Sequence, residues 1–519
     1  DPRAVKIAGL SLWLRAQRAW HQSGVKPAER PRITRSHVVC AEPMPGEKML
    51  LQEFVQKQFQ EGERPAFGFL LEQVFDQMKL AGEAGSLLRI EEGIRAAIAE
   101  AKRRWKEGPK YEQSHLFPEA AAKSGQGQMR LDLSGITDAQ FWERAEQRIY
   151  EALNAYSEKA ENGGGFQRRL FADDAAQGFA FIDLCRKRYD AVVMNPPYGD
   201  SSHAAKEYLQ ASYGGQPNDL FGCFIERSLT VGDFVGSLTS RTFLFFSSFE
   251  TLRTKYLFTS KEVTTVIDLG FGVLDGALVE TCAMVMKNRT RNSIESVFIR
   301  LTDSEDKAAT LLPTIEAARL ATANRRLFPV HQSVFEAIDG APMPYWVGQS
   351  ILNRILSYTP VYPSYADIRL GAVTSDNDQF LRLRWEVGIA DINPHLGWAS
   401  YAKGGDYSKY FGDIRLSSDW RGDGERIKMT FGQAVRLREL DQYLKPGLTY
   451  PLVTVKGMNV RVLRADCVFD NGSPALFVPA RDSRLAALGI LNSRLAELYV
   501  RCFTSSRHWQ VGYVRKLPW

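Results

Sequence analysis

Residues 189–199 read YDAVVMNPPYG, an apolar run that stops abruptly at a polar residue, two prolines, an aromatic residue and a glycine. The apolar run predicts a buried strand. In an open α/β sheet, ligands bind just beyond the carboxyl ends of the strands. The tetrapeptide from Asn195 to Tyr198 therefore stands where a catalytic or binding site is expected.

This tetrapeptide suits one reaction, the alkylation of an exocyclic amine. The lone pair of adenine N6 is delocalised into the ring, so the side-chain carbonyl of Asn195 and the main-chain carbonyl of Pro196 would each accept an N–H bond and aim the lone pair at a methyl donor. Pro196 and Pro197 restrict φ to about −65°, and Tyr198 offers a flat face to an extruded base. We predict catalytic roles for these four residues. The alternative is a proline-terminated strand whose tyrosine packs in the core.

The segments that follow alternate between strand and helix. We expect helices near 219–231 and 248–257, and strands at 234–238, 263–267 and 282–286. Continuous apolar strands that alternate with helices indicate a mostly parallel sheet covered on both faces. The predicted fold class is α/β.

The segments before the motif are mostly helical. We expect an amphipathic helix over 1–20, a short buried strand at 38–40, helices between 47 and 105, a long polar loop over 104–136, and a helix that runs from a capping box at 137–140 to the glycines at 163–165. After about residue 330, shorter apolar runs broken by Gly, Pro, Asp and Asn indicate a separate α+β domain.

The composition is that of an ordinary globular protein, with 519 residues, 44% hydrophobic and 24% charged. The net charge of +6 is compatible with a polyanionic partner without demonstrating one. The six cysteines form no C-x-x-C pair and His508 has no partner at ligand spacing, so we expect neither a disulfide framework nor a metal site. No membrane span or secretory leader is expected either, which favours a cytoplasmic protein.

On these residues the chain resembles the adenine-N6 DNA methyltransferases, in particular those of type IIG restriction-modification enzymes and the PglX methylase of BREX phage-defence systems. The methylases of DISARM systems are similar. The resemblance implies a Rossmann-like class I methyltransferase sheet with a helical insertion and a C-terminal α+β target-recognition domain. The implied domains are a partial donor-binding half (1–46), the insertion (47–188), a catalytic half (189–330) and a DNA-binding target-recognition domain (331–519).

The same resemblance implies S-adenosylmethionine as cofactor. The opening DPRAV of residues 1–5 is similar to the end of the family's acidic G-V-D-I-D-P stretch, which implies a donor contact from Asp1 and places the family's Gly-rich loop before it. Glu42 follows the expected strand at 38–40 and implies a contact with the adenine of the donor. Asn195 adjoins the same site.

The C-terminal region resembles target-recognition domains in the phrases TSDNDQF (374–380), YAKGGD (401–406), LTYP (448–451) and LNS (491–493). Lys403 and Lys409 would bind phosphates among Tyr401, Tyr407 and Tyr410, around the turn formed by Gly404 and Gly405. Arg507 and Trp509 repeat this pairing of cation and aromatic ring in the tail. The alternative is a solvated basic face over an aromatic core.

These observations lead to one main hypothesis and two alternatives. The main hypothesis is methylation of adenine N6 in duplex DNA at a specific sequence, with the adenine flipped out of the duplex, in a restriction-modification or phage-defence system that has other protein partners. One alternative is a DNA-sensing binding module that does not methylate. The other is a methyltransferase that acts on RNA or on protein glutamine.

Overall fold

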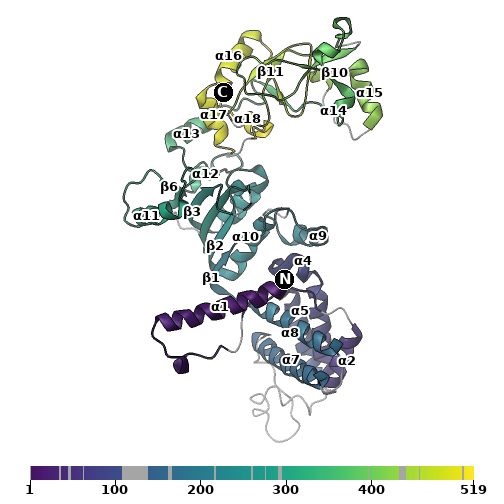
Figure 1. Cartoon of the computed structure of the whole chain (residues 1–519), viewed down its shortest axis with the longest axis vertical. Coiled ribbons are helices and arrows are strands. Elements are labelled where there is room, and N and C mark those ends of the chain that lie inside the picture. Colours follow the sequence, from purple (N-terminus) through teal and green to yellow (C-terminus); the bar gives the residue numbers. More distant parts are fainter. Residues whose placement is uncertain are drawn as a thin grey trace. The chain divides into compact units, whose positions relative to one another are not determined.

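The computed structural model divides the chain into two compact units, Asp1–Val235 and Gly236–Trp519 (Figure 1). It describes all residues except 1, 34–36, 45–47, 62, 108–137, 162–165, 216–217, 259–260, 275, 277, 290–294, 395–396, 432–439, 455 and 505–507. None of the described helices is both long enough and apolar enough to cross a membrane.

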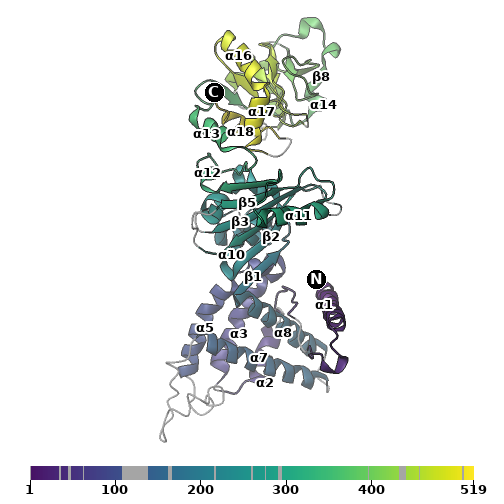
Figure 2. The same ribbon diagram turned by 90° about the vertical axis from the view of Figure 1, so that its left-hand side faces the viewer.

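The first unit is mainly helical. Its helices are α1 (Pro2–Gln22), α2 (Lys48–Gln58), α3 (Arg64–Gln77), α4 (Ala81–Ala84), α5 (Ile90–Glu107), α7 (Asp138–Glu161), α8 (Phe166–Arg186), α9 (His203–Ser212) and α10 (Leu220–Val231). Helices α3, α5, α7 and α8 lie side by side (Figure 2). Ala145, Ile149, Leu153 and Tyr156 are buried along one face of α7, as their spacing predicts.

Two expectations for the segments before the proline motif need correction. The apolar residues Val38–Cys40 are half-buried but belong to no strand and no described sheet, so the predicted buried strand is wrong. An apolar run becomes a strand only when a neighbouring strand completes its hydrogen-bond ladder. Residues 104–107 continue α5 rather than opening a loop. The rest of the predicted loop, the first residue of the predicted capping box and the glycines at 163–165 lie outside the described residues. The helix predicted between them is present as α7, which begins at Asp138.

A six-stranded sheet has the order β1-β2-β4-β3-β5-β6. Its strands are β1 (Tyr189–Met194), β2 (Gly232–Ser240), β3 (Glu262–Gly270), β4 (Thr281–Lys287), β5 (Glu295–Arg300) and β6 (Leu327–His331). β3 runs parallel to β5 but antiparallel to β4, and β5 and β6 are antiparallel. The α/β class is confirmed. The expectation of a mostly parallel sheet does not hold for β3 with β4 or for β5 with β6, which pair antiparallel.

Strand β1, which precedes the proline motif, is more exposed than predicted. It is the first strand in the sheet order. Val192 lines a pocket together with residues of α10, while Val193, on the opposite face of the strand, is 86% exposed. The expectation of a strand buried on both faces is therefore wrong for β1.

In the second unit, the helix predicted near 248–257 is present as a 3-10 turn at Ser247–Phe249 and a π-helical segment at Leu252–Phe258. Helix α11 (Lys307–Arg319) packs Leu311 and Ile315 against the sheet residues Leu269 and Ile299. This packing covers one face of β3 and β5 with apolar side chains.

The C-terminal part of this unit contains two four-stranded sheets, in the orders β13-β9-β10-β8 and β12-β11-β14-β7. The strands are β7 (Asp367–Arg369), β8 (Leu381–Leu383), β9 (Trp398–Ala402), β10 (Leu416–Asp419), β11 (Gly447–Thr449), β12 (Arg461–Leu463), β13 (Cys467–Phe469) and β14 (Ala475–Phe477). The helices are α12 (Ser333–Glu336), α13 (Gln349–Ser357), α14 (Asn377–Phe380), α15 (Arg421–Phe431), α16 (Arg481–Leu491), α17 (Arg494–Arg501) and α18 (Val511–Arg515). The α+β character expected after residue 330 is confirmed.

Candidate active site

The proline motif forms a loop directly after β1, and the side chain of Asn195 is exposed on it. Asn195 and Pro197 are exposed, Tyr198 is half-buried and Pro196 is buried. The hydroxyl of Tyr198 donates to Oδ1 of Asn195 at 3.4 Å. A bond of this length is weak, so the side-chain carbonyl of Asn195 is readily available to another donor.

The residue after the motif fixes the backbone at the end of the loop. Gly199 has φ of +100°, a conformation that side chains with a Cβ rarely adopt. Its carbonyl accepts the backbone N–H of Leu220 at 3.0 Å. The carboxylate of Asp219 accepts the backbone N–H of Phe221 at 3.3 Å and also bonds the backbone of Gly199. The N-terminus of α10 therefore holds the end of the loop in place.

Asp219 is a residue of this candidate site that sequence reasoning missed. Burial raises the pKa of its carboxyl to about 6, the backbone N–H groups of Phe221 and Gly199 oppose that rise, and the nearby charge of Asp200 adds to it. The available signal was an aspartate directly before a predicted helix, which is a common N-cap. A second contact joins the same elements, since the ring of Tyr198 meets that of Phe221 edge to face at 6.4 Å.

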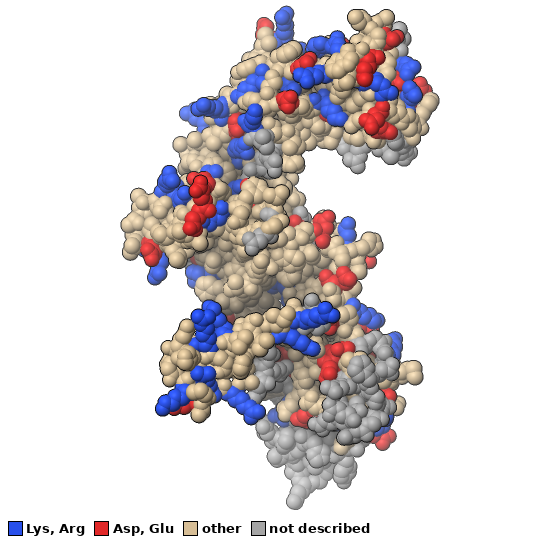
Figure 3. Space-filling view, viewed as in Figure 1, with Lys and Arg blue, Asp and Glu red and all other residues tan. Residues whose placement is uncertain are grey.

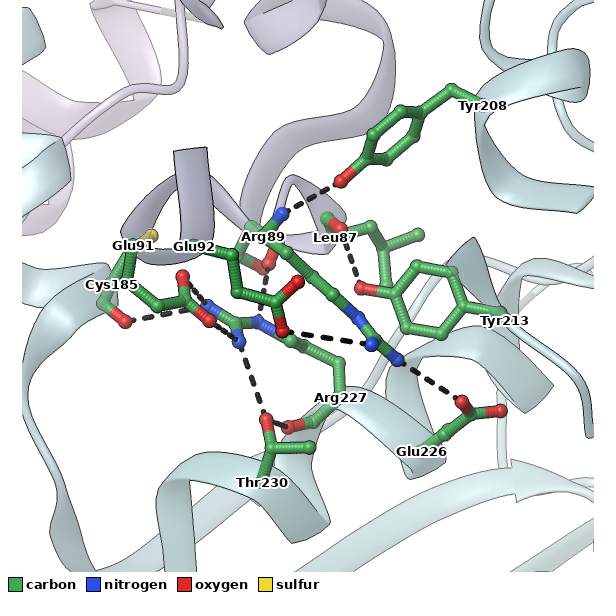
Figure 4. Close-up of polar contacts among 11 residues, drawn as sticks. Leu87, Arg89, Glu91, Glu92, Cys185, Tyr208, Tyr213, Glu226, Arg227 and Thr230 are labelled. Atoms are coloured by element: carbon green, nitrogen blue, oxygen red, sulfur yellow. Dashed lines mark hydrogen bonds and ion pairs between the residues drawn. The ribbon is translucent and has the colours of Figure 1, made fainter. Parts of the chain in front are cut away.

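Helix α10 is bound to residues 86–91 and to α8 through a buried arginine (Figure 4). Arg227 is only 4% exposed. Its guanidinium makes two hydrogen bonds to the carboxylate of Glu91, at 2.5 and 2.8 Å, and donates to the carbonyls of Ser86 and Cys185 at 3.1 and 3.3 Å. A bidentate pair with further acceptors satisfies most of the donors of a buried guanidinium.

Neighbouring contacts tie the same segment to α9 and α10. Arg89 forms an ion pair with Glu226 at 3.2 Å, and its backbone N–H donates to the hydroxyl of Tyr208 at 2.8 Å. The hydroxyl of Tyr213 donates to the carbonyl of Leu87 at 2.5 Å. Figure 4 shows these side chains converging from different elements. We call the contacts of residues 86–91 with α8, α9 and α10 the arginine junction.

A pocket of about 410 Å³ adjoins β1, but it does not by itself make a donor site. Apolar residues such as Val39, Ala41 and Val192 line most of it, and no acidic residue is among its lining residues. Glu42 is half-buried outside this lining, near Asp174, whose pKa is raised first by burial and then by the charge of Glu42. Asp1 lies outside the described residues. The described residues therefore do not fit a complete S-adenosylmethionine site.

The predicted DNA-binding loop lies at the end of β9. Lys403 and Gly405 are exposed, and Gly405 has φ of +98°. A pocket of about 670 Å³ is lined by Lys403, Gly404 and Gly405 together with charged residues that include Asp406 and Arg415. Exposed aromatic side chains follow along the chain at Tyr407, Tyr410 and Phe411. Figure 3 shows Lys and Arg side chains interspersed with Asp and Glu over this part of the chain.

Other predicted DNA contacts lie elsewhere. The Nζ of Lys409 donates to the carbonyl of Asn492 at 2.6 Å, which gives this half-buried lysine a structural role. Tyr401 is buried in the core. Trp509 is fully buried beneath Arg501, whose guanidinium lies 4.9 Å from its ring, so the predicted DNA contact of Trp509 is wrong. A ring packed in the core cannot stack on a base. Arg507 lies outside the described residues.

Comparison with known proteins places the chain in a family of methylases. Residues 1–273 match the family described as Eco57I restriction-modification methylase. The adenine-specific methyltransferase BrxX of Escherichia coli O9:H4 (strain HS) is 29% identical over 356 residues, which cover 64% of this chain and 28% of that protein. The adenine-specific methyltransferase PglX of Lacticaseibacillus casei (strain Zhang) is 24% identical over 354 residues, which cover 64% of this chain and 29% of that protein. The matched stretch spans less than a third of either relative.

Among solved structures, the type IIL restriction-modification enzyme MmeI in complex with DNA matches with a TM-score of 0.43 and 9% identity. The match covers 89% of this chain and 66% of that chain.

Proposed function

Because the chain belongs to the Eco57I restriction-modification methylase family, we propose that it methylates the N6 amine of adenine in duplex DNA, with Asn195, Pro196, Pro197 and Tyr198 as its catalytic loop. Two relatives bear the name adenine-specific methyltransferase. The chain would act within a cytoplasmic restriction-modification or phage-defence system, alongside other defence proteins.

One observation carries the proposal: the Oδ1 atom of Asn195 faces outward at the end of β1, on a backbone that α10 holds in place. An adenine flipped out of the duplex would replace Tyr198 as the donor to this oxygen and give its second N–H to the carbonyl of Pro196. Two fixed acceptors would aim the lone pair of N6 at the methyl donor before the reaction begins. Tyr198 would then stack on the base.

The methyl group comes from S-adenosylmethionine, the donor of this family of methylases. Glu42 and Asn195 are the described residues that we propose as donor contacts, and Asp1 is proposed on resemblance alone. Since the described residues do not fit a complete donor site, we assign this chain the positioning of the amine and no step on the donor.

We propose that the second unit contacts DNA through Lys403, Gly404 and Gly405. An exposed ammonium group on a glycine turn can reach a phosphate oxygen, and the exposed rings of Tyr410 and Phe411 can stack on bases or sugars. In the same pocket, Asp406 and Arg415 offer an acceptor and a fork of donors for base edges.

The domain boundaries at 46/47, 188/189 and 330/331 stay predictions.

The test is to incubate the full-length protein with labelled S-adenosylmethionine and with duplex DNA, RNA or protein substrate in separate reactions, and to identify the labelled product. The wild type should yield N6-methyladenine. Asn195→Ala should lower the rate about 100-fold or more because one of the two acceptors is lost, while Glu207→Ala, on an exposed position of α9, should leave it unchanged. Label in RNA or protein alone would favour the alternative methyltransferases, and DNA binding without any label would favour the binding module.

A further inference from the structure

A small pocket rich in arginine lies at one end of β5 and β6 in the second unit. The two strands pair with Ile299 opposite Leu327, which brings Arg300, the last residue of β5, beside Arg326, the residue before β6. The backbone N–H of Arg300 donates to the carbonyl of Arg326 at 2.9 Å. The pocket has a volume of about 300 Å³ and is lined by Arg300, Thr302, Asp303, Arg325, Arg326 and Phe328.

The lining carries more positive than negative charge. Arg326 forms an ion pair with Asp303 at 2.5 Å, and its guanidinium holds the pKa of that carboxyl below its usual value. The Nε of Arg300 donates to the hydroxyl of Thr302 at 3.2 Å. Within the described part of the chain, neither Arg300 nor Arg325 forms an ion pair with a carboxylate. Two of the three guanidinium groups are therefore not neutralised by direct contact.

A buried carboxylate lies close in the sheet but is engaged elsewhere. Asp268 of β3 is the register partner of Arg300 in the parallel pairing of β3 and β5. Its Oδ2 atom accepts from Arg241 at 2.6 Å and from the hydroxyl of Tyr345 at 2.7 Å. Arg300 instead lies over the ring of Trp346, at 5.1 Å from its centroid. This stacking orients the guanidinium of Arg300 without neutralising it.

We propose that this arginine pocket binds a phosphate group of the DNA backbone. Planar guanidinium groups match phosphate oxygens with paired hydrogen bonds, and the hydroxyl of Thr302 adds a further donor. The pocket adjoins the carboxyl ends of the parallel strands β3 and β5, the edge at which α/β sheets bind ligands. Arg325 and Asp303 are exposed at the pocket, so a phosphodiester can approach from solvent. The proposal rests on the proposed action on DNA.

The first test is the salt dependence of DNA binding by the full-length protein. Arg325→Gln removes one phosphate contact, so the slope of log K against log salt should become shallower by about 0.9. The loss of affinity relative to wild type should therefore be about 3.5-fold larger at 50 mM than at 200 mM salt, and it should be the same for target and non-target sequences. Arg319→Gln, which removes an exposed arginine of α11 outside the pocket, is the matched control and should leave the slope unchanged.

A second variant predicts the opposite change. Asp303→Asn removes the pocket's one carboxylate and releases Arg326, so DNA binding should become tighter and the slope steeper. If the Asp303–Arg326 ion pair is only structural, Asp303→Asn should bind DNA more weakly than wild type or with the same affinity and salt slope. The inference is overturned if Arg325→Gln behaves like Arg319→Gln, or if Asp303→Asn does not tighten binding.

Two further measurements distinguish DNA binding at the pocket from binding of free phosphate and from failure of the proposed catalytic loop. If inorganic phosphate at constant ionic strength raises the melting temperature of the wild type but not of Arg325→Gln, while the two proteins bind DNA with the same affinity and the same salt slope, the pocket is a site for free phosphate and the DNA assignment fails. Methylation is measured in parallel with Asn195→Ala. If that variant methylates normally, the proposed catalytic loop fails, whereas a normal salt slope in Arg325→Gln with Asn195 still required overturns only the arginine pocket.

Discussion

The proposed chemistry at Asn195 depends on a backbone that does not move when the base arrives. Gly199 supplies the positive φ that ends the loop, and Asp219 bonds the backbone of Gly199 and of Phe221 at the start of α10. A hydrogen-bond acceptor that is already in position loses little freedom on binding substrate. Asp219 is thus a positioning residue, since it acts through Gly199 and does not touch the base.

The titration of Asp219 gives a prediction for stability. Burial raises its pKa to about 6 from an ordinary value of 3.8, so the folded state favours the neutral carboxyl. The contribution of this group is present in full below the unfolded value and is lost as pH rises through about 6. Asp219→Asn, which keeps an N-cap acceptor, should therefore melt above wild type near neutral pH, and the difference should vanish below about pH 4.

Melting temperatures of wild type and Asp219→Asn, measured in parallel between pH 3 and 8, check this expectation. One group can change the free energy of unfolding by at most about 2.3RT per pH unit. Glu207→Gln is the matched control, because it removes an exposed carboxylate of α9 that is not among the groups acting on Asp219. Parallel melting curves for wild type and Asp219→Asn at all pH values would contradict the account.

At the same scale, a local motif is easier to recognise in a sequence than burial. The catalytic role of Asn195 to Tyr198 could be predicted because the whole pattern lies in neighbouring residues, and it stays a prediction. Trp509 was misassigned because an aromatic residue between polar neighbours looks exposed, whereas distant packing buries it completely. The structural contact of Lys409 could not be predicted for the same reason, since its partner Asn492 is remote in the sequence.

At the scale of elements, α10 links the proposed catalytic loop to the arginine junction. Its N-terminus holds Gly199, and Arg227 near its other end binds Glu91 at the start of α5. A guanidinium with this little exposure needs its carboxylate, because a buried charge without its partner is costly. The junction should therefore determine where α10, and with it the loop, is placed.

Removing the carboxylate tests this dependence. Glu91→Gln should destabilise the first unit by about 3–5 kcal/mol, since Arg227 would stay buried without its counter-charge. It should also slow methylation while leaving DNA affinity unchanged. Calorimetric unfolding and single-turnover rates measure both effects. Asp76→Asn, which breaks an exposed pair with Lys79 on α3, should change neither, and a Glu91→Gln variant as stable as this control would refute the junction's role.

The elements themselves were predicted to different degrees. The core face of α7 and the apolar strands β3 and β4 follow from hydrophobic period alone. The pairing of those strands did not, because an apolar strand has the same pattern in parallel and antiparallel sheets when both of its faces are covered. The run at 38–40 was mistaken for a strand for a related reason, since only a neighbouring strand can make it one.

At the scale of the whole molecule, catalysis and DNA contact are assigned to different units. Lys403 of the second unit and the loop of the first would serve one substrate, so their variants should fail in different ways. Lys403→Ala should weaken DNA binding for every sequence and reduce the salt slope by about 0.9. Trp509→Phe should lower stability by about 1–3 kcal/mol and leave DNA affinity unchanged, because its ring is buried.

Fluorescence anisotropy of labelled duplexes at several salt concentrations, together with thermal unfolding, distinguishes the two variants. A Trp509→Phe protein that keeps its melting temperature but loses DNA affinity would show that the tail reaches DNA after all. A Lys403→Ala protein with an unchanged salt slope would remove the glycine turn from the interface.

The most direct measurement of the central claim is the single-turnover methylation rate of Asn195→Asp and Asn195→Ala with DNA bound to saturation. The aspartate keeps a side-chain carbonyl oxygen at the end of β1 and the alanine does not. We predict a rate for Asn195→Ala that is lower by about 100-fold or more, a clearly faster rate for Asn195→Asp, and unchanged DNA affinity for both. An alanine variant that methylates adenine at the wild-type rate would contradict the claim that this carbonyl orients the amine.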